Sequence, residues 1–323
     1  MIKAIAITGP TASGKTALSI GLAKRISGEI ISLDSMQIYE GMDIGTAKAT
    51  ESERGAVKHH LLDFLPPTES FSANSYKEMA LPIAEDISAR GGMPIFVGGT
   101  GLYLSTLMRP ECESAPPSSR EYREAIEKTL VTEADRIALW ERLYKIDKAS
   151  AEAVHYNNVR RVIRALEIYD ATGKTKTYFD ELTQAKSDKI DVFHITIDFH
   201  SRDELYHRVD TRVDVMMREG LLSEVRELYE KGLLIPETTA AQAIGYKEMV
   251  EYIEGKITLA DAVENIKQAS RNYAKRQLTW FRNQPGTYTV YKDTEDGKIK
   301  SDYALLCECF DLLRDENFIQ KCK

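Results

Sequence analysis

Apolar residues in the first hundred positions occur in two kinds of pattern. Short continuous apolar runs predict buried strands, over 2–8, 29–33 and 93–97. Between these runs, apolar residues recur at helical spacing, in the segments 14–27 and 75–90. A weaker run at 60–63 predicts one further strand. This alternation of strands and helices predicts an α/β fold with a doubly wound parallel sheet.

The alternation stops near residue 110. Residues 110–118 hold three of the ten prolines and predict a linker, and the pattern from 119 to about 178 is helical. Strand character returns at 192–198, a helical pattern follows over 202–283, and the tail has a strand-like run at 287–291 before a last helix. We therefore predict the first part of an α/β core (1–114), a helical insertion (115–187), and a largely helical completion of the core with a C-terminal tail (188–323).

A glycine-rich loop lies between the first predicted strand and the first predicted helix. It matches the pattern G-x-x-x-x-G-K-[ST] through Gly9, Pro10, Thr11, Ala12, Ser13, Gly14, Lys15 and Thr16. Backbone N–H groups and the helix N-terminus can hold an anion there, Lys15 supplies a charge, and the Thr16 hydroxyl can ligate Mg²⁺. This P-loop motif is typical of nucleotide-binding and ATP-binding proteins, and it predicts a phosphate or diphosphate site. No N-K-x-D signature accompanies it, so a GTPase is disfavoured, whereas a kinase or another transferase stays open.

Two aspartates stand at the ends of predicted strands, where doubly wound folds bind their ligands. Asp34 follows the strand at 29–33, and Asp198 ends the strand at 192–198. Either carboxylate could hold Mg²⁺ beside the phosphate loop, and Asp34 could instead act as a general base on an acceptor. The structural alternative for Asp34 is a helix N-cap, which Asp fills well.

The chain carries 43 Lys and Arg against 50 Asp and Glu, a net charge of −7. This balance argues against a protein that coats DNA nonspecifically, but not against a nucleic-acid enzyme whose basic residues cluster. Residues 265–292 contain six cations and no acid, with Arg271 and Lys275 on one helix face. Such a segment suits phosphate contact, and a solvated face is the structural alternative. We expect Tyr273 and Trp280, on another face, to pack into the core.

Two further groups of arginines fall on predicted helices. Arg160, Arg161 and Arg164 lie away from the apolar side of their helix, so we expect them to project outward. Arg208 and Arg212 form an i, i+4 pair in a helix rich in acids, where surface ion pairing is the plain interpretation.

Cysteine and hydropathy patterns bear on the compartment. The four cysteines, Cys112, Cys307, Cys309 and Cys322, form no C-x-x-C pair, which favours free thiols in a reducing cytoplasm over disulfides or zinc. No apolar run approaches the ~20 residues that span a bilayer. His59 and His60 have no metal-ligand partner at suitable spacing, so we interpret them as structural. We expect a cytoplasmic monomer without a membrane partner.

A series of motifs runs along the chain. They are G-P-T-A-S-G-K-T at 9–16, D-S-M-Q-I-Y at 34–39, G-M-D-I-G-T-A-K at 41–48, H-H-L-L-D at 59–63, V-G-G-T-G-L-Y-L at 97–104, V-R-R-V-I-R-A-L-E-I-Y at 159–169, A-I-G-Y-K-E at 243–248 and R-N-Y-A-K-R-Q-L-T-W-F at 271–281. In this order, over roughly residues 4–283, the chain resembles the tRNA dimethylallyltransferase (isopentenyltransferase) family. It departs from the family at Ser270, where Thr is frequent, in the segment 108–118, and in the tail after about 286.

The resemblance implies transfer of a dimethylallyl group from dimethylallyl diphosphate to N6 of the adenosine just 3′ of the tRNA anticodon, with Mg²⁺ and without ATP. The phosphate loop would hold the donor diphosphate beside Arg212, with Thr16 as metal ligand. Asp34 would remove the N6 proton, and Thr100 would hydrogen-bond the bridging oxygen of the leaving group. The residues expected to contact the tRNA anticodon stem-loop are Asp34, Ser35, Met36, Gln37, Thr100, Arg123, Asn158, Val159, Arg160, Arg161, Val162, Arg271 and Lys275.

Three other functions compete with this one. A P-loop kinase acting on a small molecule or nucleotide would bind ATP tightly and carry an arginine-bearing lid. A nonenzymatic RNA-binding module fits poorly, because Lys15, Thr16, Asp34 and Thr100 are all present. Prenyl transfer to free adenine nucleotides is the third, and the helical insertion and basic patches favour tRNA over it.

Overall fold

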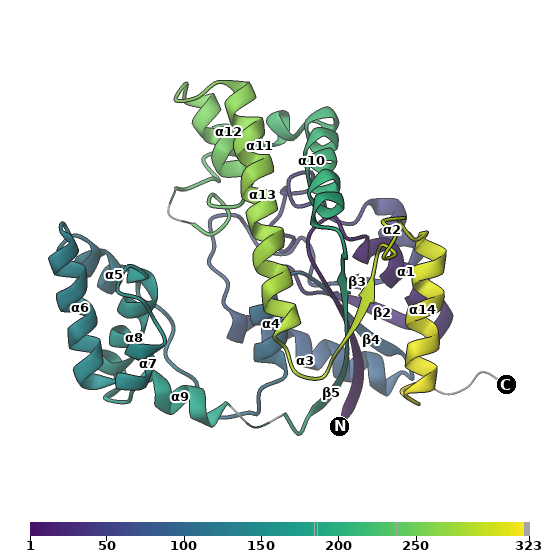
Figure 1. The fold of residues 1–323 in the computed structure, drawn as a ribbon, viewed down its shortest axis with the longest axis horizontal. Helices are drawn as coiled ribbons and strands as arrows, with labels where there is room; N and C mark the ends of the chain where they lie inside the picture. The colour runs from purple at the N-terminus through teal and green to yellow at the C-terminus, as the bar shows by residue number, and fades with distance from the viewer. Residues whose placement is uncertain (184, 186, 237, 320–323) are drawn as a thin grey trace. The chain divides into compact units, whose positions relative to one another are not determined.

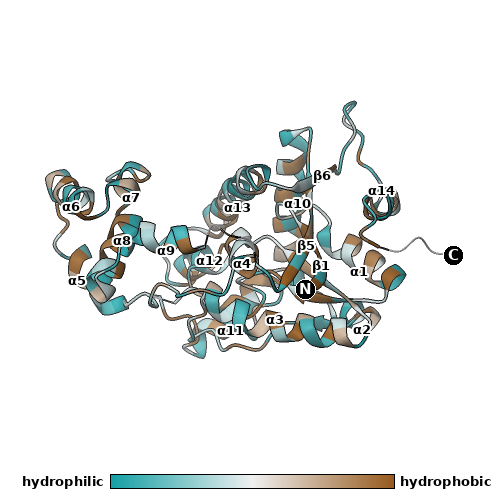
Figure 2. Cartoon of the chain, turned by 90° about the horizontal axis from the view of Figure 1, so that it is seen from below, coloured by the Kyte–Doolittle hydropathy of each residue, from teal (hydrophilic) through white to brown (hydrophobic). Residues whose placement is uncertain are grey.

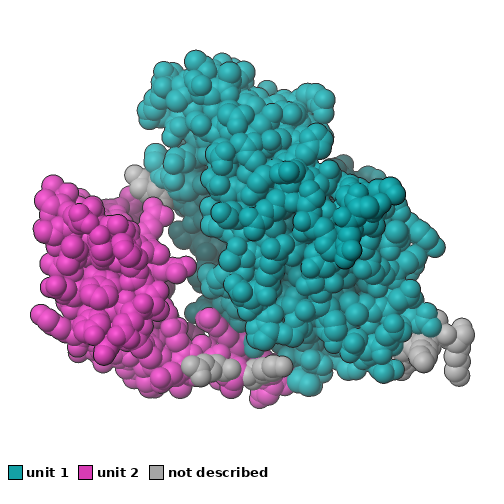
Figure 3. Space-filling view, viewed as in Figure 1, with its two compact units in different colours: residues 1–108, 190–323 teal, residues 109–189 magenta. Residues whose placement is uncertain are grey.

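The computed structural model describes residues 1–183, 185, 187–236 and 238–319. The chain divides into two compact units, which Figure 3 colours separately. The larger unit comprises Met1–Met108 and Ile190–Lys323, and the smaller unit comprises Arg109–Lys189. The smaller unit therefore includes the proline-rich segment 110–118, although the sequence suggested that the insertion begins at 115.

The larger unit is built on one six-stranded parallel sheet (Figure 1). Its strands, in the spatial order β3-β2-β4-β1-β5-β6, are β3 (His59–His60), β2 (Gly28–Ser32), β4 (Met93–Gly98), β1 (Ile2–Thr8), β5 (Ile190–Asp198) and β6 (Thr287–Tyr291). The predicted α/β class and parallel sheet are confirmed. The strand-like run in the tail is also a strand, and it extends the sheet beside β5.

Helices pack on both faces of this sheet. Successive residues of β1 alternate between the faces, so Ile5 and Ile7 contact one layer and Ala4 and Ala6 the other. The first layer contains α1 (Lys15–Ile26) and α14 (Asp302–Asp315), and the second contains α3 (Ala73–Ala89) and α4 (Gly101–Leu107). A strand buried on both faces needs continuous apolar sequence, which explains why the runs at 2–8 and 93–97 predicted strands correctly.

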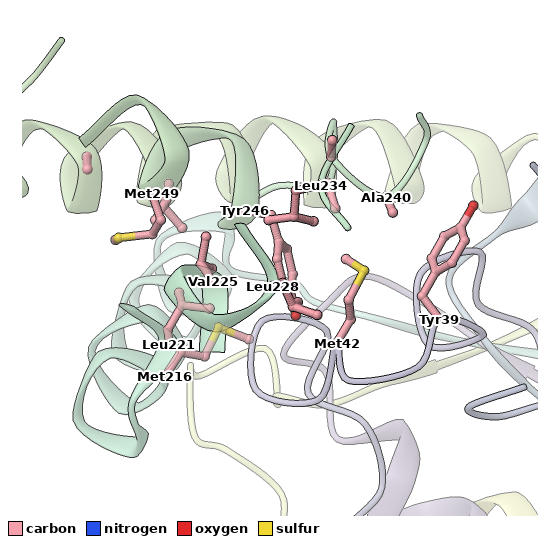
Figure 4. Close-up of a cluster of buried hydrophobic side chains, with 14 of the residues drawn as sticks. Tyr39, Met42, Met216, Leu221, Val225, Leu228, Leu234, Ala240, Tyr246 and Met249 are labelled. Atoms are coloured by element: carbon pink, nitrogen blue, oxygen red, sulfur yellow. The ribbon is translucent and has the colours of Figure 1, made fainter. Parts of the chain in front are cut away.

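Four further helices of the larger unit share another apolar cluster. They are α10 (Arg202–Glu219), α11 (Leu221–Glu230), α12 (Tyr246–Ile253) and α13 (Leu259–Arg282). The short helix α2 (Glu51–Ala56) contributes no residue to it. Figure 4 shows Tyr39 and Met42, from the segment after β2, beside side chains of these helices. The expected helical run over 202–283 is interrupted. The described residues of 231–245 contain no helix and include pocket residues, and residues 254–258 separate α12 from α13.

The smaller unit contains helices and no strand in its described residues. Its helices are α5 (Arg120–Glu127), α6 (Glu133–Ile146), α7 (Lys148–Glu152), α8 (Val159–Thr172) and α9 (Lys176–Leu182). Leu143 of α6 packs against Val162 and Leu166 of α8. Figure 2 shows both hydrophobic and hydrophilic residues on these helices, as expected of helices that bury one side.

The strand predicted near residue 60 is shorter than expected. The strand expected at 60–63 is confined to His59–His60, because Leu61 and Asp63 adopt left-handed φ angles of 57° and 59° that end the extended backbone.

Cys112, Cys307 and Cys309 are free thiols, and Cys322 lies outside the described residues. Among the helices that the structure describes, none combines the length and the apolar character needed to cross a membrane.

Candidate active site

Three adjacent strands end at one edge of the sheet, and the loops that follow them form the site. β1 leads into the phosphate loop, β4 into the loop that carries Thr100, and β2 into Asp34. The Leu33 N–H donates to the Val97 carbonyl at 2.7 Å, and the Thr100 N–H donates to the Leu33 carbonyl at 3.1 Å. A Cβ on Gly98 would lie 2.1 Å from the Leu33 carbonyl oxygen, so only glycine allows this approach.

The phosphate loop folds around its own lysine. Gly14 has a left-handed φ of 88° and ends the loop where α1 begins, at Lys15. The Lys15 Nζ donates to the carbonyl of Gly9 at 3.1 Å and to that of Pro10 at 2.6 Å. Burial, and secondly the charge of Arg212, lower the pKa of Lys15 to about 7, while Asp34 acts in the opposite direction. This lysine can therefore change its charge near neutral pH.

A pocket of about 870 Å³ opens beside the phosphate loop. Of the loop residues, Gly9 and Pro10 are not part of its wall, and their carbonyls accept hydrogen bonds from Lys15. The predicted site residues that do line the pocket are Thr11, Ala12, Ser13, Gly14, Lys15, Thr16, Asp34, Ser35, Met36, Gln37 and Arg212. The structure thus brings the phosphate loop together with the segment after β2.

Asp34 is half-buried and combines a structural contact with a carboxylate oxygen that stays available. Its Oδ1 accepts hydrogen bonds from the N–H groups of Met36, at 2.9 Å, and Gln37, at 3.3 Å, which fixes the turn after β2. The helix N-cap alternative is wrong, because residues 35–50 contain no helix. Among the described residues, no donor to Oδ2 is found. Its charge acts on Lys15 and Arg212, so the carboxylate lies within electrostatic range of the pocket cations. One oxygen of Asp34 therefore holds the turn while the other stays available for reaction chemistry.

Thr100 lies beside the start of the same segment. Its Oγ1 accepts from the Ser35 N–H at 3.0 Å and donates to Ser35 Oγ at 3.3 Å. The side chain of Tyr273 of α13 lies close enough to Thr100 for the threonine to act on its pKa. Burial, and secondly the charge of Asp34, raise the pKa of Tyr273, so this tyrosine stays protonated at neutral pH.

The arginines of α10 face the pocket. Arg208 Nε donates to the Ala12 carbonyl at 3.0 Å, and Arg212 Nη2 donates to the Thr46 carbonyl at 3.4 Å. The Nε of Arg212 is buried and has no partner among the described residues. Burial lowers the pKa of Arg212, and Asp34 opposes that shift. Surface ion pairing is therefore wrong for both residues.

Glu224 is a structural residue of the site that the sequence did not reveal. One oxygen of its carboxylate accepts from the N–H groups of Asp43 and Ile44, at 3.0 and 2.7 Å, and the other from Gly45 at 3.1 Å. The Tyr246 hydroxyl donates to it at 2.5 Å. Glu224 thereby holds the segment that ends in the pocket residues Thr46 and Ala47. The residues that Glu224 contacts belong to the motifs 41–48 and 243–248, but neither motif includes Glu224 itself.

Comparison with known proteins identifies the kind of site. The family model described as IPP transferase matches residues 37–284. The chain belongs to the IPP transferase family. It is 48% identical over 283 residues to a tRNA dimethylallyltransferase of Anoxybacillus flavithermus and 50% identical over 283 residues to one of Geobacillus thermodenitrificans, with 87% of this chain and 88% of each relative covered.

Solved structures give the same result. A tRNA delta(2)-isopentenylpyrophosphate transferase from Staphylococcus epidermidis matches with a TM-score of 0.70 and 42% identity, over 98% of this chain and 100% of that one. A eukaryotic dimethylallyltransferase acting on tRNA matches with a TM-score of 0.80 and 30% identity, over 100% of this chain and 82% of that one. These matches support prenyl transfer over the kinase alternative.

In this IPP transferase, the arginines of α8 do not form one patch. Arg160 and Arg161 are exposed, and no carboxylate lies within ion-pair distance of them in the described parts of the chain. Arg164 does not project outward as expected: its Nη1 donates to Glu167 at 2.6 Å, and its Nη2 donates to the Pro116 carbonyl. Val162 is fully buried, so the expected tRNA contact is wrong for its side chain.

Three other residues of the smaller unit are expected to contact tRNA: Asn158, Val159 and Arg123. Asn158 is exposed at the N-cap of α8 and makes no side-chain capping bond, and Val159 is half-buried. Arg123 is half-buried in α5, which packs on α8, and its Nη2 donates to Ser118 Oγ at 2.6 Å. Their contact with tRNA stays a prediction.

The acid-free segment 265–292 is largely neutralised in space. Asp210 and Glu264 hold Arg271 at 2.7 and 2.9 Å, and carboxylates of other segments pair with Lys267, Arg282 and Lys292. Lys275 is exposed and has no carboxylate partner among the described residues. Although the segment contains no acid, it is therefore not a basic surface. Its charge does not identify Arg271 as a tRNA contact.

The expected core positions of Tyr273 and Trp280 are wrong. Tyr273 lines the pocket, and Trp280 is 39% exposed. Trp280 packs on Gly101, where an added Cβ would lie 2.1 Å from the indole Nε1. Asp198 is also misassigned as a metal candidate, because Arg282 binds both of its oxygens, at 2.6 and 2.8 Å, and it does not line the pocket.

Proposed function

We propose that this protein transfers the dimethylallyl group of dimethylallyl diphosphate to N6 of the adenosine 3′-adjacent to the anticodon in tRNA. The products are N6-isopentenyladenosine and diphosphate. The observation that carries the proposal is the meeting of the phosphate loop and Asp34 in one pocket, in a chain that belongs to the IPP transferase family. Thr100 is not part of the pocket wall, but it hydrogen-bonds to the pocket residue Ser35.

The donor diphosphate binds at the phosphate loop. Lys15 exchanges its carbonyl partners for the anion, and the loop amides at the start of α1 add partial positive charge. Arg212 supplies a second cation, and its unpaired buried Nε is a donor available to the anion. An allylic C–O bond breaks readily once the charge of the departing diphosphate is neutralised, so these groups promote the reaction by electrostatic stabilisation.

Asp34 acts on the acceptor. The lone pair of the adenine N6 amine is delocalised into the ring, which makes the amine a poor nucleophile. As the C–N bond forms and the C–O bond breaks, the N6 proton passes to the carboxylate, whose Oδ1 is held by two backbone N–H groups. The Thr100 hydroxyl donates a hydrogen bond to the bridging oxygen of the leaving group, in place of its bond to Ser35 Oγ.

Mg²⁺ fits the residues present. This ion usually binds one or two carboxylates, substrate phosphates and several waters, not a cage of protein ligands. The described residues contain no cluster of three or more His, Cys, Asp or Glu that could hold a metal, whereas Thr16 and Asp34 line the same pocket as the loop. Thr16 would hold the ion beside the donor, and the bound ion supplies further charge neutralisation of the diphosphate.

The tRNA contacts divide between the two units. Ser35, Met36 and Gln37 line the pocket and contact the adenosine, which must leave its base stack to reach N6. The exposed Arg160 and Arg161 bind phosphates of the anticodon stem-loop. The protein acts as a monomer in the cytoplasm, where its tRNA substrate is found.

The direct test is incubation of the protein with dimethylallyl diphosphate, Mg²⁺ and unmodified tRNA. Mass spectrometry should detect N6-isopentenyladenosine, and ATP in place of the prenyl donor should give no phosphoryl transfer to tRNA or adenosine. Replacement of tRNA by AMP distinguishes transfer to free nucleotides. A phosphorylated product with ATP and no prenylated product would support the kinase alternative instead.

A further inference from the structure

Gln277 joins two loops of the pocket. It lies in α13 and is 5% exposed. Its Oε1 accepts a hydrogen bond from the Thr11 N–H at 2.9 Å, and its Nε2 donates to the Gly99 carbonyl at 3.0 Å. A single side chain thus connects the phosphate loop to the loop that carries Thr100.

The surroundings of Gln277 allow little freedom. A Cβ added at Gly99 would lie 2.0 Å from its Nε2, so any larger residue before Thr100 would displace the Gln277 amide. Tyr273, one turn earlier in α13, lies close enough to both Gln277 and Thr100 for their side chains to act on its pKa. A buried amide whose donor and acceptor are both paired has one favourable orientation, because turning it over would bring carbonyl against carbonyl.

We propose that Gln277 is a positioning residue for the transfer step. It sets the separation between the diphosphate held by the phosphate loop and the Thr100 hydroxyl, where donor and adenosine meet. This inference rests on the proposed function, which assigns the two loops to donor and leaving group. Gln277 itself reaches its partners only through the backbone groups of Thr11 and Gly99.

Such positioning matters because the reacting atoms must approach to about 3–3.5 Å in the correct direction, and a shift of about 1 Å can cost ~10²-fold in rate.

A neutral amide also suits a position between two loops that hold an anionic donor. A carboxylate in its place would accept the Thr11 N–H equally well, but it could not donate to Gly99, and its charge would repel the donor diphosphate.

These differences define three variants. Gln277→Met keeps the length of the side chain and removes both hydrogen bonds. Gln277→Glu keeps the bond from Thr11, loses the bond to Gly99 and adds negative charge. Gln268→Met is the matched control, because Gln268 is an exposed glutamine of the same helix outside the pocket wall. The measurements are kcat, KM for donor, Kd for tRNA, and thermal stabilisation by inorganic diphosphate with Mg²⁺.

For Gln277→Met, we expect kcat to fall about 10–100-fold, since both loops lose their tie. For Gln277→Glu, we expect KM for donor to rise about tenfold or more and the stabilisation by diphosphate to shrink, because the added charge repels the anion. Kd for tRNA stays the same in both, and Gln268→Met behaves like the wild type.

Two results would overturn the inference. One is wild-type kcat and donor KM in both Gln277 variants. The other is a loss of kcat that matches only the fraction of unfolded protein, with diphosphate binding unchanged in Gln277→Glu. Either result, alongside normal transfer by the wild type, removes the role of Gln277 and leaves the proposed function intact. Failure of the wild type to prenylate tRNA would remove the proposed function itself.

Discussion

The cations of the two compact units differ in their surroundings. In the larger unit, Lys15 and Arg212 lie in the pocket wall, and burial lowers the pKa of both side chains. In the smaller unit, Arg160 and Arg161 are exposed, and no ion pair involves them in the part of the chain that the structure describes. Burial of the charges of Lys15 and Arg212 costs free energy in the free protein, whereas Arg160 and Arg161 stay exposed to solvent.

This difference separates two tasks. Buried cations already aimed at an anion stabilise developing charge without reorganisation, which suits the chemical step. Exposed arginines attract phosphates by releasing counterions, which gives binding that depends on salt but little geometric control. Variants in the pocket should therefore alter donor use and turnover, and variants on α8 should alter tRNA affinity.

The largest effect is expected from Asp34→Ala. Loss of the general base should lower kcat by ~10²–10⁴-fold, while tRNA affinity by filter binding stays nearly unchanged. Asp311→Ala, which removes an exposed acid of α14, is the control. Retention of more than about a tenth of the wild-type kcat would rule out general-base catalysis by Asp34.

Lys15→Met should chiefly affect the donor. Removal of a charged donor to the diphosphate should raise KM for dimethylallyl diphosphate by about 10–100-fold, with little change in Kd for tRNA. Lys24→Met, on the exposed side of the same helix, should match the wild type. Lost tRNA affinity with a normal donor KM would reverse the assignment of the two units.

Donor affinity should depend on pH through Lys15. Its pKa in the folded protein is about 7, so the protonated fraction falls as pH rises through that value and the attraction for diphosphate falls with it. With saturating Mg²⁺, Kd for the donor should weaken above pH 7 by up to about tenfold per pH unit. Calorimetric titration from pH 6 to 9 tests this, and Lys15→Met should show a flatter profile near pH 7. A wild-type profile that is flat in this range would show that the lysine keeps its proton in the free protein.

The salt dependence of tRNA binding tests whether Arg160 and Arg161 of α8 contact tRNA phosphates. In the Arg160→Ala, Arg161→Ala double variant, tRNA binding should weaken, and the slope of log affinity against log salt should flatten by about one unit per lost phosphate contact. KM for donor should hardly move. An unchanged slope would mean that these arginines are only a solvated helix face.

Arg271→Ala should give the smallest effect. Because Asp210 and Glu264 already hold this arginine, its removal should leave the salt slope unchanged and lower the free energy of unfolding by about 1 kcal/mol. Denaturant unfolding measures the latter quantity. If the slope flattened as much as in the double variant, Arg271 would exchange its carboxylates for tRNA phosphates, and the contrast between the two regions would be weaker than we infer.

Features set by neighbouring residues could be predicted from the sequence alone. The strands at 2–8 and 93–97 appear as continuous apolar runs because both faces of the parallel sheet are buried. The phosphate loop is one contiguous segment, so its motif already contains the backbone geometry and the lysine. Asp34 was predictable as a site residue because parallel strands end at the same edge of a sheet. Thr100 was expected there from the family resemblance.

Features set by distant residues were decided only by the tertiary structure. Arg271 appeared free because its own segment has no acid, but its partner Asp210 belongs to another helix. Gln277 and Glu224 looked like ordinary polar positions, since their partners are backbone groups far away in sequence. Hydropathy patterns and helical spacing describe a residue's own element only. Charge neutralisation and the pairing of buried polar groups depend on which other elements pack against it, and that is known only once the chain has folded.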